Sequence, residues 1–92
     1  MIQSFRCSET RAIYEGKPSR RFGNIRRIIE RKLEMLDNAV VLKDLLVLPA
    51  NRLESLKGDR QGQHSIRIND QYRICFRWTD RGPEDVEVVD YH

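Results

Sequence analysis

The chain has 92 residues, of which 39% are hydrophobic and 34% charged, and its formal net charge is +3 at pH 7. This composition excludes a disordered chain and suits one small folded domain, so we treat residues 1–92 as a single unit. No apolar run approaches the length that spans a membrane, and the opening residues lack the apolar core of a signal peptide. We therefore expect a cytoplasmic protein without a membrane partner.

The two cysteines, Cys7 and Cys75, are not accompanied by a second cysteine or a histidine at metal-ligand spacing. A disulfide between them is possible in principle, but buried or half-buried free thiols are the commoner state of such cysteines. The sequence excludes a structural zinc or iron–sulfur site, and we expect neither a metal nor another cofactor.

The N-terminal part of the chain predicts mainly helices. "IQSF" suits a short first strand, and "SETRAIYEG" predicts a short helix with Ser8 as its N-cap and Gly16 as its stop. The clearest helix is predicted over residues 19–38, with Asn38 at its C-terminal end. Its apolar residues recur every three or four positions and form one stripe: Phe22, Ile25, Ile29, Leu33 and Leu36.

The segment after this helix predicts less regular structure. Residues 39–48 are apolar enough for a second short helix or a buried turn of chain, which Pro49 ends. Residues 49–63 predict a long connection, and connections of this length in small domains are often functional.

Beyond this connection the hydrophobic period changes from that of a helix to that of a strand. "QHSIRIN" and "QYRICFRW" alternate apolar and polar residues and predict two strands joined by a tight turn at Asn69-Asp70. "EDVEVVD" predicts a third strand after the turn "TDRGP". The expected architecture is α+β, with an N-terminal strand and helices packed on one face of a twisted antiparallel sheet.

The alternation in the first two of these strands places Arg67, Arg73 and Arg77 on the face opposite to the helices. Arginines clustered on a sheet face can clamp phosphate groups in bidentate fashion. Antiparallel sheets also commonly have one solvated face, so simple exposure explains the same residues. The basic residues of the helix over 19–38 allow the same two interpretations: a surface for nucleic acid or an acidic protein, or a solvated helix.

The sequence given closes on Asp90, Tyr91 and His92, which carry a carboxylate, a phenol and an imidazole. Three polar residues at a chain end usually form a frayed tail. They are also groups that transfer protons, and a neighbouring carboxylate favours the protonated imidazole. The other histidine, His64, starts a strand on the parity of its apolar residues, so we expect it to pack there or at the edge.

Cleavage of RNA suits this set of groups. RNA carries its own nucleophile, the 2′-hydroxyl, so the protein needs only a base, an acid and cations around the phosphate. His92 and Asp90 are candidates for the proton transfers. Lys57 and Arg73 are candidates for stabilising the phosphate, and Tyr91 for stacking on a base or bonding the phosphate. These groups converge only if the last strand lies beside the hairpin, with its end near Arg73.

"LKGDR", "SIRIND", "YRICFRW" and the terminal "DYH", in that order, resemble the HigB-type toxins, the plasmid-maintenance killer family within the RelE/ParE superfamily. "MIQSF" and "ERKLEMLDNA" fit as well, so the resemblance covers essentially the full chain. It implies a compact RelE-like, microbial-RNase-like fold. It also implies a bacterial toxin of a type II toxin–antitoxin system, an endoribonuclease that cleaves mRNA on the ribosome without metal and inhibits translation. The implied partners are the ribosome, mRNA and a HigA-type helix-turn-helix antitoxin, with operator DNA bound only through the antitoxin.

The resemblance also implies site residues. Carried over by position, the terminal Asp-Tyr-His of the family falls on Asp90, Tyr91 and His92, and its basic active-site residues fall on Lys57 and Arg73. The remaining candidates for RNA binding are Arg60, Arg67 and Arg77. Some relatives have a histidine where this chain has Glu54. A glutamate suits a general base but not a cationic acid at neutral pH, so the division of acid and base roles stays open.

The same superfamily contains ParE-type toxins, which bind DNA gyrase and lack a comparable set of catalytic residues. That non-enzymatic role is the alternative to the endonuclease, and His92 is the residue that argues against it. Direct binding of DNA has little support, because no recognition-helix motif stands out.

Overall fold

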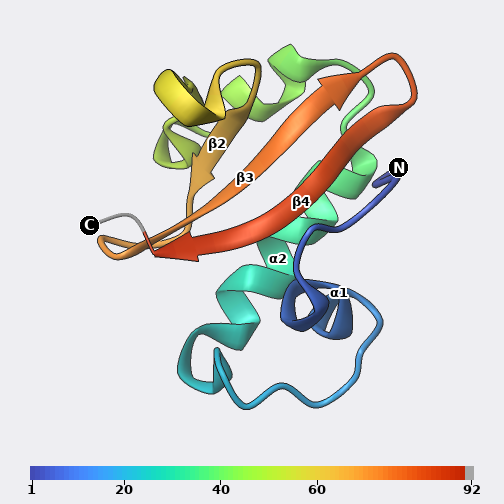
Figure 1. The fold of residues 1–92 in the computed structure, drawn as a ribbon, viewed down its shortest axis with the longest axis vertical. Coiled ribbons are helices and arrows are strands. Elements are labelled where there is room, and N and C mark those ends of the chain that lie inside the picture. Colours follow the sequence, from blue (N-terminus) through green and yellow to red (C-terminus); the bar gives the residue numbers. More distant parts are fainter. Residues whose placement is uncertain (91–92) are drawn as a thin grey trace.

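The computed structural model describes residues 1–90 and has an α+β architecture (Figure 1). The two α-helices are α1 (Ser8–Tyr14) and α2 (Arg26–Asn38). The strands are β1 (Glu54–Ser55), β2 (His64–Arg67), β3 (Tyr72–Thr79) and β4 (Gly82–Asp90). Four short 3-10 helices lie between them: η1 (Gly23–Ile25), η2 (Leu42–Leu46), η3 (Pro49–Asn51) and η4 (Gly58–Arg60).

The sheet has the strand order β1-β2-β3-β4, and every pair is antiparallel. Both α-helices lie on one side of the twisted sheet, as expected (Figure 1). The expected three-stranded meander is extended by β1, which lies inside the segment predicted to be a plain connection. Its two residues have no alternating apolar pattern, so a strand could not be predicted there.

The predicted first strand is reduced to one parallel bridge between Phe5 and Val86. Backbone bonds still hold the segment along β4, since Arg6 N–H donates to Val86 at 3.0 Å and Val86 N–H donates to Ser4 at 3.1 Å. The ladder is short because β4 bulges at Asp85, whose φ is +53°. The N-terminal residues therefore border β4 without forming a regular strand.

Helix α1 agrees with its prediction except at its first residue. Its N-cap is Cys7 and Ser8 is its first helical residue. Gly16 ends it with a φ of +78°, and Lys17 N–H donates to the Ala12 carbonyl at 2.8 Å. This 6→1 bond closes the last turn, and it requires the left-handed backbone that glycine adopts without strain.

Helix α2 begins at Arg26, seven residues after the predicted start at Ser19. The Ser19 hydroxyl donates to Glu9 Oε2 at 2.5 Å and caps no helix. Gly23 starts the 3-10 turn η1, consistent with the weak helix propensity of glycine. The end at Asn38 is as predicted.

The predicted apolar stripe forms the core against one face of the sheet. Ile29, Leu33 and Leu36 are at most 1% exposed, and they belong to one cluster with Ile74 and Phe76 of β3. Burial of such side chains stabilises the domain by about 1.5–3 kcal/mol each. None of the helices within residues 1–90 is long and apolar enough to cross a membrane.

The opposite face of the sheet is covered in part, which corrects the expectation of an open arginine-bearing face. Ser65 of β2 and Cys75 of β3 point to that face, yet both are fully buried. Arg60 of the connecting segment reaches across this face to Glu87 of β4. The segment 49–63 thus forms a third layer over part of the sheet.

Candidate active site

Arg73 is the most firmly held charged side chain on the face away from the helices. Its Nε donates to Ser65 Oγ at 2.7 Å, and its Nη2 donates to the Arg52 carbonyl at 2.5 Å and the Ser65 carbonyl at 3.3 Å. The residue is only 8% exposed. Three acceptors and the surrounding chain therefore fix the guanidinium in one orientation, as a group that must meet a phosphate in defined geometry requires.

The Arg52 carbonyl is placed by an unusual backbone conformation. Arg52 follows η3 and has a φ of +45°, which few residues other than glycine adopt. Its neighbour Asn51 is 1% exposed, donates to the Leu45 carbonyl at 3.1 Å and accepts from Lys32 Nζ at 2.5 Å. These bonds tie the connecting segment to α2, so the carbonyl that faces Arg73 belongs to an anchored turn.

Lys32 is accordingly a structural residue and not part of a solvated basic helix face. It is 9% exposed, and burial lowers the pKa of its ammonium group, with added repulsion from Arg31 and Arg67.

Arg60 approaches the same face from η4. Its Nη1 donates to Glu87 Oε1 at 2.8 Å and to Gln63 Oε1 at 3.1 Å. Cys75 lies beneath this pair, and burial raises the pKa of its thiol, while the charges of Arg60 and Arg73 act in the opposite direction. Cys75 is a free, buried thiol and Cys7 a free, half-buried one, as predicted.

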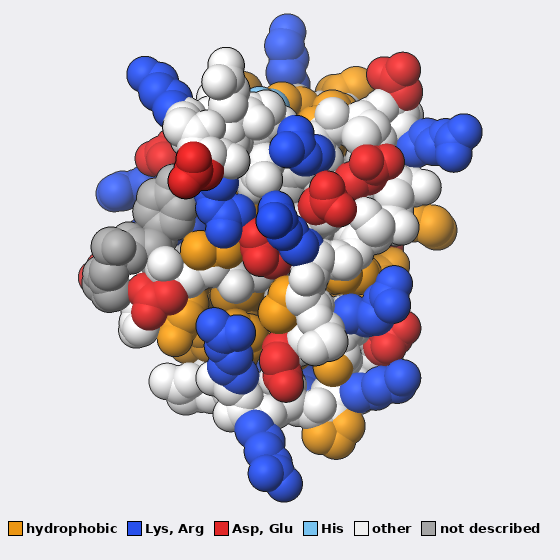
Figure 2. All heavy atoms as spheres, viewed as in Figure 1, with side chains coloured by type: hydrophobic (Ala, Val, Ile, Leu, Met, Phe, Trp, Pro, Cys, Tyr) orange, Lys and Arg blue, Asp and Glu red, His pale blue; other side chains and the backbone are white. Residues whose placement is uncertain are grey.

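Arg67 and Arg77 share this face, and each has an acidic neighbour. Arg67 is the register partner of Arg73, and its Nη2 lies 2.5 Å from Asp70 Oδ1 in the hairpin turn. Arg77 Nε lies 3.7 Å from Asp85 Oδ2. Figure 2 shows basic and acidic side chains interspersed over the visible face of the molecule. The predicted arginines share one face, but they do not form an uninterrupted positive patch.

Glu54 and Lys57 lie on β1 and on the turn that follows it. Glu54 is the register partner of Ser65, and its Oε2 lies 4.0 Å from Arg73 Nη2. This places a carboxylate beside the most buried arginine. Lys57 directly precedes η4 and is exposed.

The end of β4 lies beside the start of β3, where Arg73 lies. Val89 is the register partner of Arg73, and Asp90 is the partner of Tyr72. Asp90 Oδ2 accepts a hydrogen bond from Gln71 Nε2 at 3.0 Å. The end of β4 thus lies beside Arg73, as the prediction required. Asp90, the last described residue, pairs with Tyr72, which packs against the core, so strand alternation places its side chain on the face opposite to Arg73. Tyr91 and His92 lie outside the described residues.

His64 packs within the sheet, as predicted, with its ring stacked on Phe76 at a centroid distance of 6.1 Å. Its Nδ1 is buried and has no hydrogen-bond partner among residues 1–90. The expected turn at Asn69 is also present, where Asn69 Oδ1 accepts from the N–H groups of Gln71 and Tyr72. This turn fixes the hairpin that carries Arg67 and Arg73.

Sequence reasoning missed the two residues that hold Arg73. Ser65 had a usable signal, because the strand alternation places it on the face of Arg67 and Cys75. Arg52 had none, because its role depends on a backbone carbonyl and a positive φ that no residue type indicates.

The layered α+β fold, with its arginines on the sheet face opposite the helices, is the RelE-like fold. The structure is similar to a chain of the YoeB-YefM complex from Staphylococcus aureus, with a TM-score of 0.61 and 18% sequence identity. The similarity covers all of this chain and 95% of that one, and at this identity it shows the fold alone.

The sequence comparisons are more specific. Residues 3–92 match the family described as "RelE-like toxin of type II toxin-antitoxin system HigB". "Toxin HigB-1" of Vibrio cholerae is 39% identical over 82 residues, which are 87% of this chain and 86% of that protein. "Endoribonuclease HigB" of Proteus vulgaris is 30% identical over 97 aligned residues spanning both proteins. The chain belongs to the HigB-like family, and as a toxin of a type II toxin–antitoxin system it has an antitoxin as partner.

Proposed function

We propose that this HigB-like toxin is a ribosome-dependent endoribonuclease that cleaves mRNA and inhibits translation. The observation that carries the proposal is Arg73, fixed on the sheet face beside the end of β4. The name of the Proteus vulgaris relative, "Endoribonuclease HigB", supports the same activity.

The proposed reaction uses the 2′-hydroxyl of RNA as its nucleophile. A base takes the 2′-hydroxyl proton, the oxygen attacks the adjacent phosphorus, and the 5′-oxygen leaves with a proton from an acid. The products are a 2′,3′-cyclic phosphate and a 5′-hydroxyl. The reaction as written balances in atoms and protons without a metal ion. Asp90 and His92 are assigned to the proton transfers, and Glu54 is the further candidate for the base.

The cations are assigned to the phosphate, whose negative charge becomes more concentrated on its oxygens in the transition state. Arg73 supplies a preorganised guanidinium, and Lys57 supplies an exposed ammonium group that can move to meet the substrate. Tyr91 is assigned to base stacking or to the phosphate. The flanking RNA would be held through its backbone by Arg60, Arg67 and Arg77. Each of these arginines would bind a phosphate in place of its acidic neighbour or together with it.

The proposed setting is the bacterial cytoplasm, where ribosomes and mRNA are present. The antitoxin is proposed to be of the HigA type, a helix-turn-helix protein that neutralises the toxin. Operator DNA is then contacted through the antitoxin and not by this chain.

Mapping of mRNA cleavage in a reconstituted translation reaction tests the function. We expect the wild-type chain to cut mRNA within codons only when ribosomes translate it, and His92→Ala to lose at least about 100-fold in rate, as removal of a general acid or base does. Arg20→Ala, at an exposed position outside the site, is the matched control and should cut normally.

Two outcomes contradict parts of this proposal. Intact mRNA together with inhibited supercoiling by DNA gyrase would replace the endonuclease with the ParE-like role. Full cleavage by a folded His92→Ala protein would leave the endonuclease but remove His92 from its mechanism.

A further inference from the structure

Large hydrophobic side chains that stay exposed among residues 1–90 gather in one region. Five of the seven lie between Val40 and Leu48, with exposed fractions from 44% to 83%. The 3-10 helix η2 buries Leu45 and leaves the side chains around it in solvent. Exposed apolar groups that are contiguous, unlike scattered ones, mark surfaces that bind a partner.

Three hollows extend this apolar segment across the end of α2. The first, of about 400 Å³, lies between α2 and η2 and has a mainly apolar lining that includes Met35, Leu45 and Val47. The second, also of about 400 Å³, lies beside Met1 and Val40. The first and second hollows share Asn38 and Ala39.

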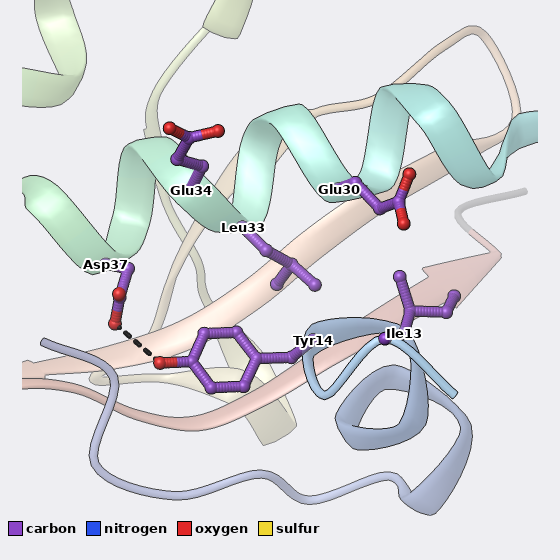
Figure 3. Close-up of a pocket in the computed structure, with 7 residues that line it drawn as sticks. Ile13, Tyr14, Glu30, Leu33, Glu34 and Asp37 are labelled. Atoms are coloured by element: carbon purple, nitrogen blue, oxygen red, sulfur yellow. Dashed lines mark hydrogen bonds between the residues drawn. The ribbon is translucent and has the colours of Figure 1, made fainter.

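The third hollow, of about 270 Å³, lies between α1 and α2. Figure 3 shows Leu33 pointing toward α1, and the Tyr14 hydroxyl donating to Asp37 Oδ1, a bond of 3.0 Å. This hollow shares Asp37 with the second one. Met1 and Tyr14, the other two exposed large hydrophobic residues, line the second and third hollows. We call the three hollows together with the segment Val40–Leu48 the α2 band.

The α2 band is acidic although the chain as a whole is basic. Its hollows are lined by one basic side chain, Arg81, and by five carboxylates: Glu30, Glu34, Asp37, Asp44 and Asp80. The segment Val40–Leu48 adds one exposed basic side chain, Lys43, so carboxylates still outnumber basic side chains in the band. The backbone N–H groups of Val41 and Val40 donate to the Asp44 carboxylate and lower the pKa of this group. A surface with this charge repels RNA and anionic lipid, so its partner is a protein.

We propose that the α2 band is the docking surface for the antitoxin, through an antitoxin segment that presents aliphatic side chains together with lysine or arginine. The inference rests on the toxin–antitoxin pairing and not on the chemistry of the proposed RNA cleavage. Aliphatic anchors fill the hollow beside η2, and cationic side chains meet the carboxylates between α1 and α2, which matches the apolar centre and charged rim of stable interfaces. The band contains none of the residues assigned to RNA.

Charge and apolar variants of the band test this docking surface. The binding partner in the assay is the antitoxin of this toxin, purified and titrated against it. Val40→Glu/Val47→Glu places two charges at positions that are 83% and 77% exposed, so the fold is retained. Glu30→Lys reverses one charge on the wall of the third hollow. Asn24→Glu, at an exposed position outside the band, is the matched control.

We expect the double variant to weaken binding at least about 100-fold, Glu30→Lys about 10-fold, and the control less than about 2-fold, as for hot-spot and peripheral positions of an interface. A double variant that binds within about 3-fold of wild type overturns the proposal. So does a dimer of the wild-type chain alone that the double variant dissociates, because the band would then hold a second copy.

Measuring mRNA cleavage by the same variants separates this inference from the proposed function. Variants that cut mRNA but escape neutralisation support both. If the variants no longer bind the antitoxin and the wild-type chain does not cut mRNA either, the docking surface is supported and the endonuclease is rejected. Variants that cut mRNA and are still neutralised reject the docking surface alone.

Discussion

Two cations assigned to the phosphate, Arg73 and Lys57, differ in how the structure holds them. Arg73 is nearly buried between β2 and the turn at Arg52, whereas Lys57 is exposed. The donors of a guanidinium have a fixed planar arrangement. Arg73 is therefore suited to orient a phosphate, whereas the exposed side chain of Lys57 can move as the phosphate binds.

Replacement of Arg73 by lysine should separate charge from geometry. Lysine cannot satisfy both Ser65 Oγ and the Arg52 carbonyl, which Arg73 holds at 2.7 and 2.5 Å. We expect mRNA cleavage to fall at least about 10-fold, because a single ammonium group replaces a positioned fork. We also expect a loss of about 1–3 kcal/mol in unfolding free energy, because buried acceptors lose their donors.

Arg20→Lys is the matched control for this prediction, since it makes the same exchange at an exposed position outside the site. Its cleavage rate and denaturation midpoint should stay close to those of wild type. Equal rates for Arg73→Lys and wild type would show that charge alone matters at position 73.

At the scale of elements, the β3–β4 turn lies against the start of the chain. Gly82 has a φ of +127°, and a Cβ at this position would lie 2.2 Å from the Met1 carbonyl oxygen. Gln3 N–H donates to the Pro83 carbonyl at 2.8 Å in the same place. The absence of a side chain at Gly82 thus lets the N-terminal segment approach the start of β4.

Gly82→Ala should therefore destabilise the protein by at least about 2 kcal/mol, through both the strained φ and the backbone clash. Gly23→Ala is the matched control, because a Cβ there meets nothing within 4 Å and φ is not in the left-handed region. It should be neutral or stabilising by up to about 1 kcal/mol. Urea denaturation of both variants measures the difference, and equal midpoints would contradict this account of the turn.

Elements with a strong period were predictable, and elements that depend on tertiary contacts were not. The alternation around Ile66 and Ile74 predicted β2 and β3, and the apolar stripe predicted α2 up to Asn38. The predicted start of α2 was wrong because the residues before Arg26 form the 3-10 helix η1, which begins at Gly23. β1 was missed because it has only two residues, which are too few for a hydrophobic period, and it exists through its pairing with β2.

The candidate site was predictable only where side-chain alternation decides position. Arg67, Arg73 and Arg77 do share a face, but the layer formed by residues 49–63 and the ion pairs of these arginines follow from packing across the sheet. The roles assigned to Tyr91 and His92 remain predictions from the sequence.

For the whole molecule, the charge distribution separates two surfaces. The arginine-bearing sheet face carries the proposed RNA contacts, and the acidic α2 band lies at the end of α2 and beside α1. A toxin of this kind can meet an anionic substrate and a cationic partner on different surfaces. Because bound RNA releases its counterions while apolar anchoring releases few, the two interactions should differ in salt dependence.

RNA binding by the chain should accordingly weaken steeply with salt, with log K falling by about 0.7 per phosphate contact for each unit of log salt concentration. Arg77→Gln should lower this slope by about one contact, whereas the control Asn24→Glu should leave it unchanged. Fluorescence anisotropy with a single-stranded RNA over a range of salt concentrations measures both. An unaltered slope for Arg77→Gln would remove Arg77 from the RNA contacts.

The position of β4 has a consequence for folding during synthesis. β4 lies between β3 and the bridge at Phe5, and it is synthesised after every other strand. Contacts between residues so far apart in sequence form late and slowly in folding. The sheet therefore closes only once β4 has left the exit tunnel. If the protein acts on translating ribosomes as proposed, the surroundings of Arg73 are completed only after β4 has emerged from the ribosome that makes it.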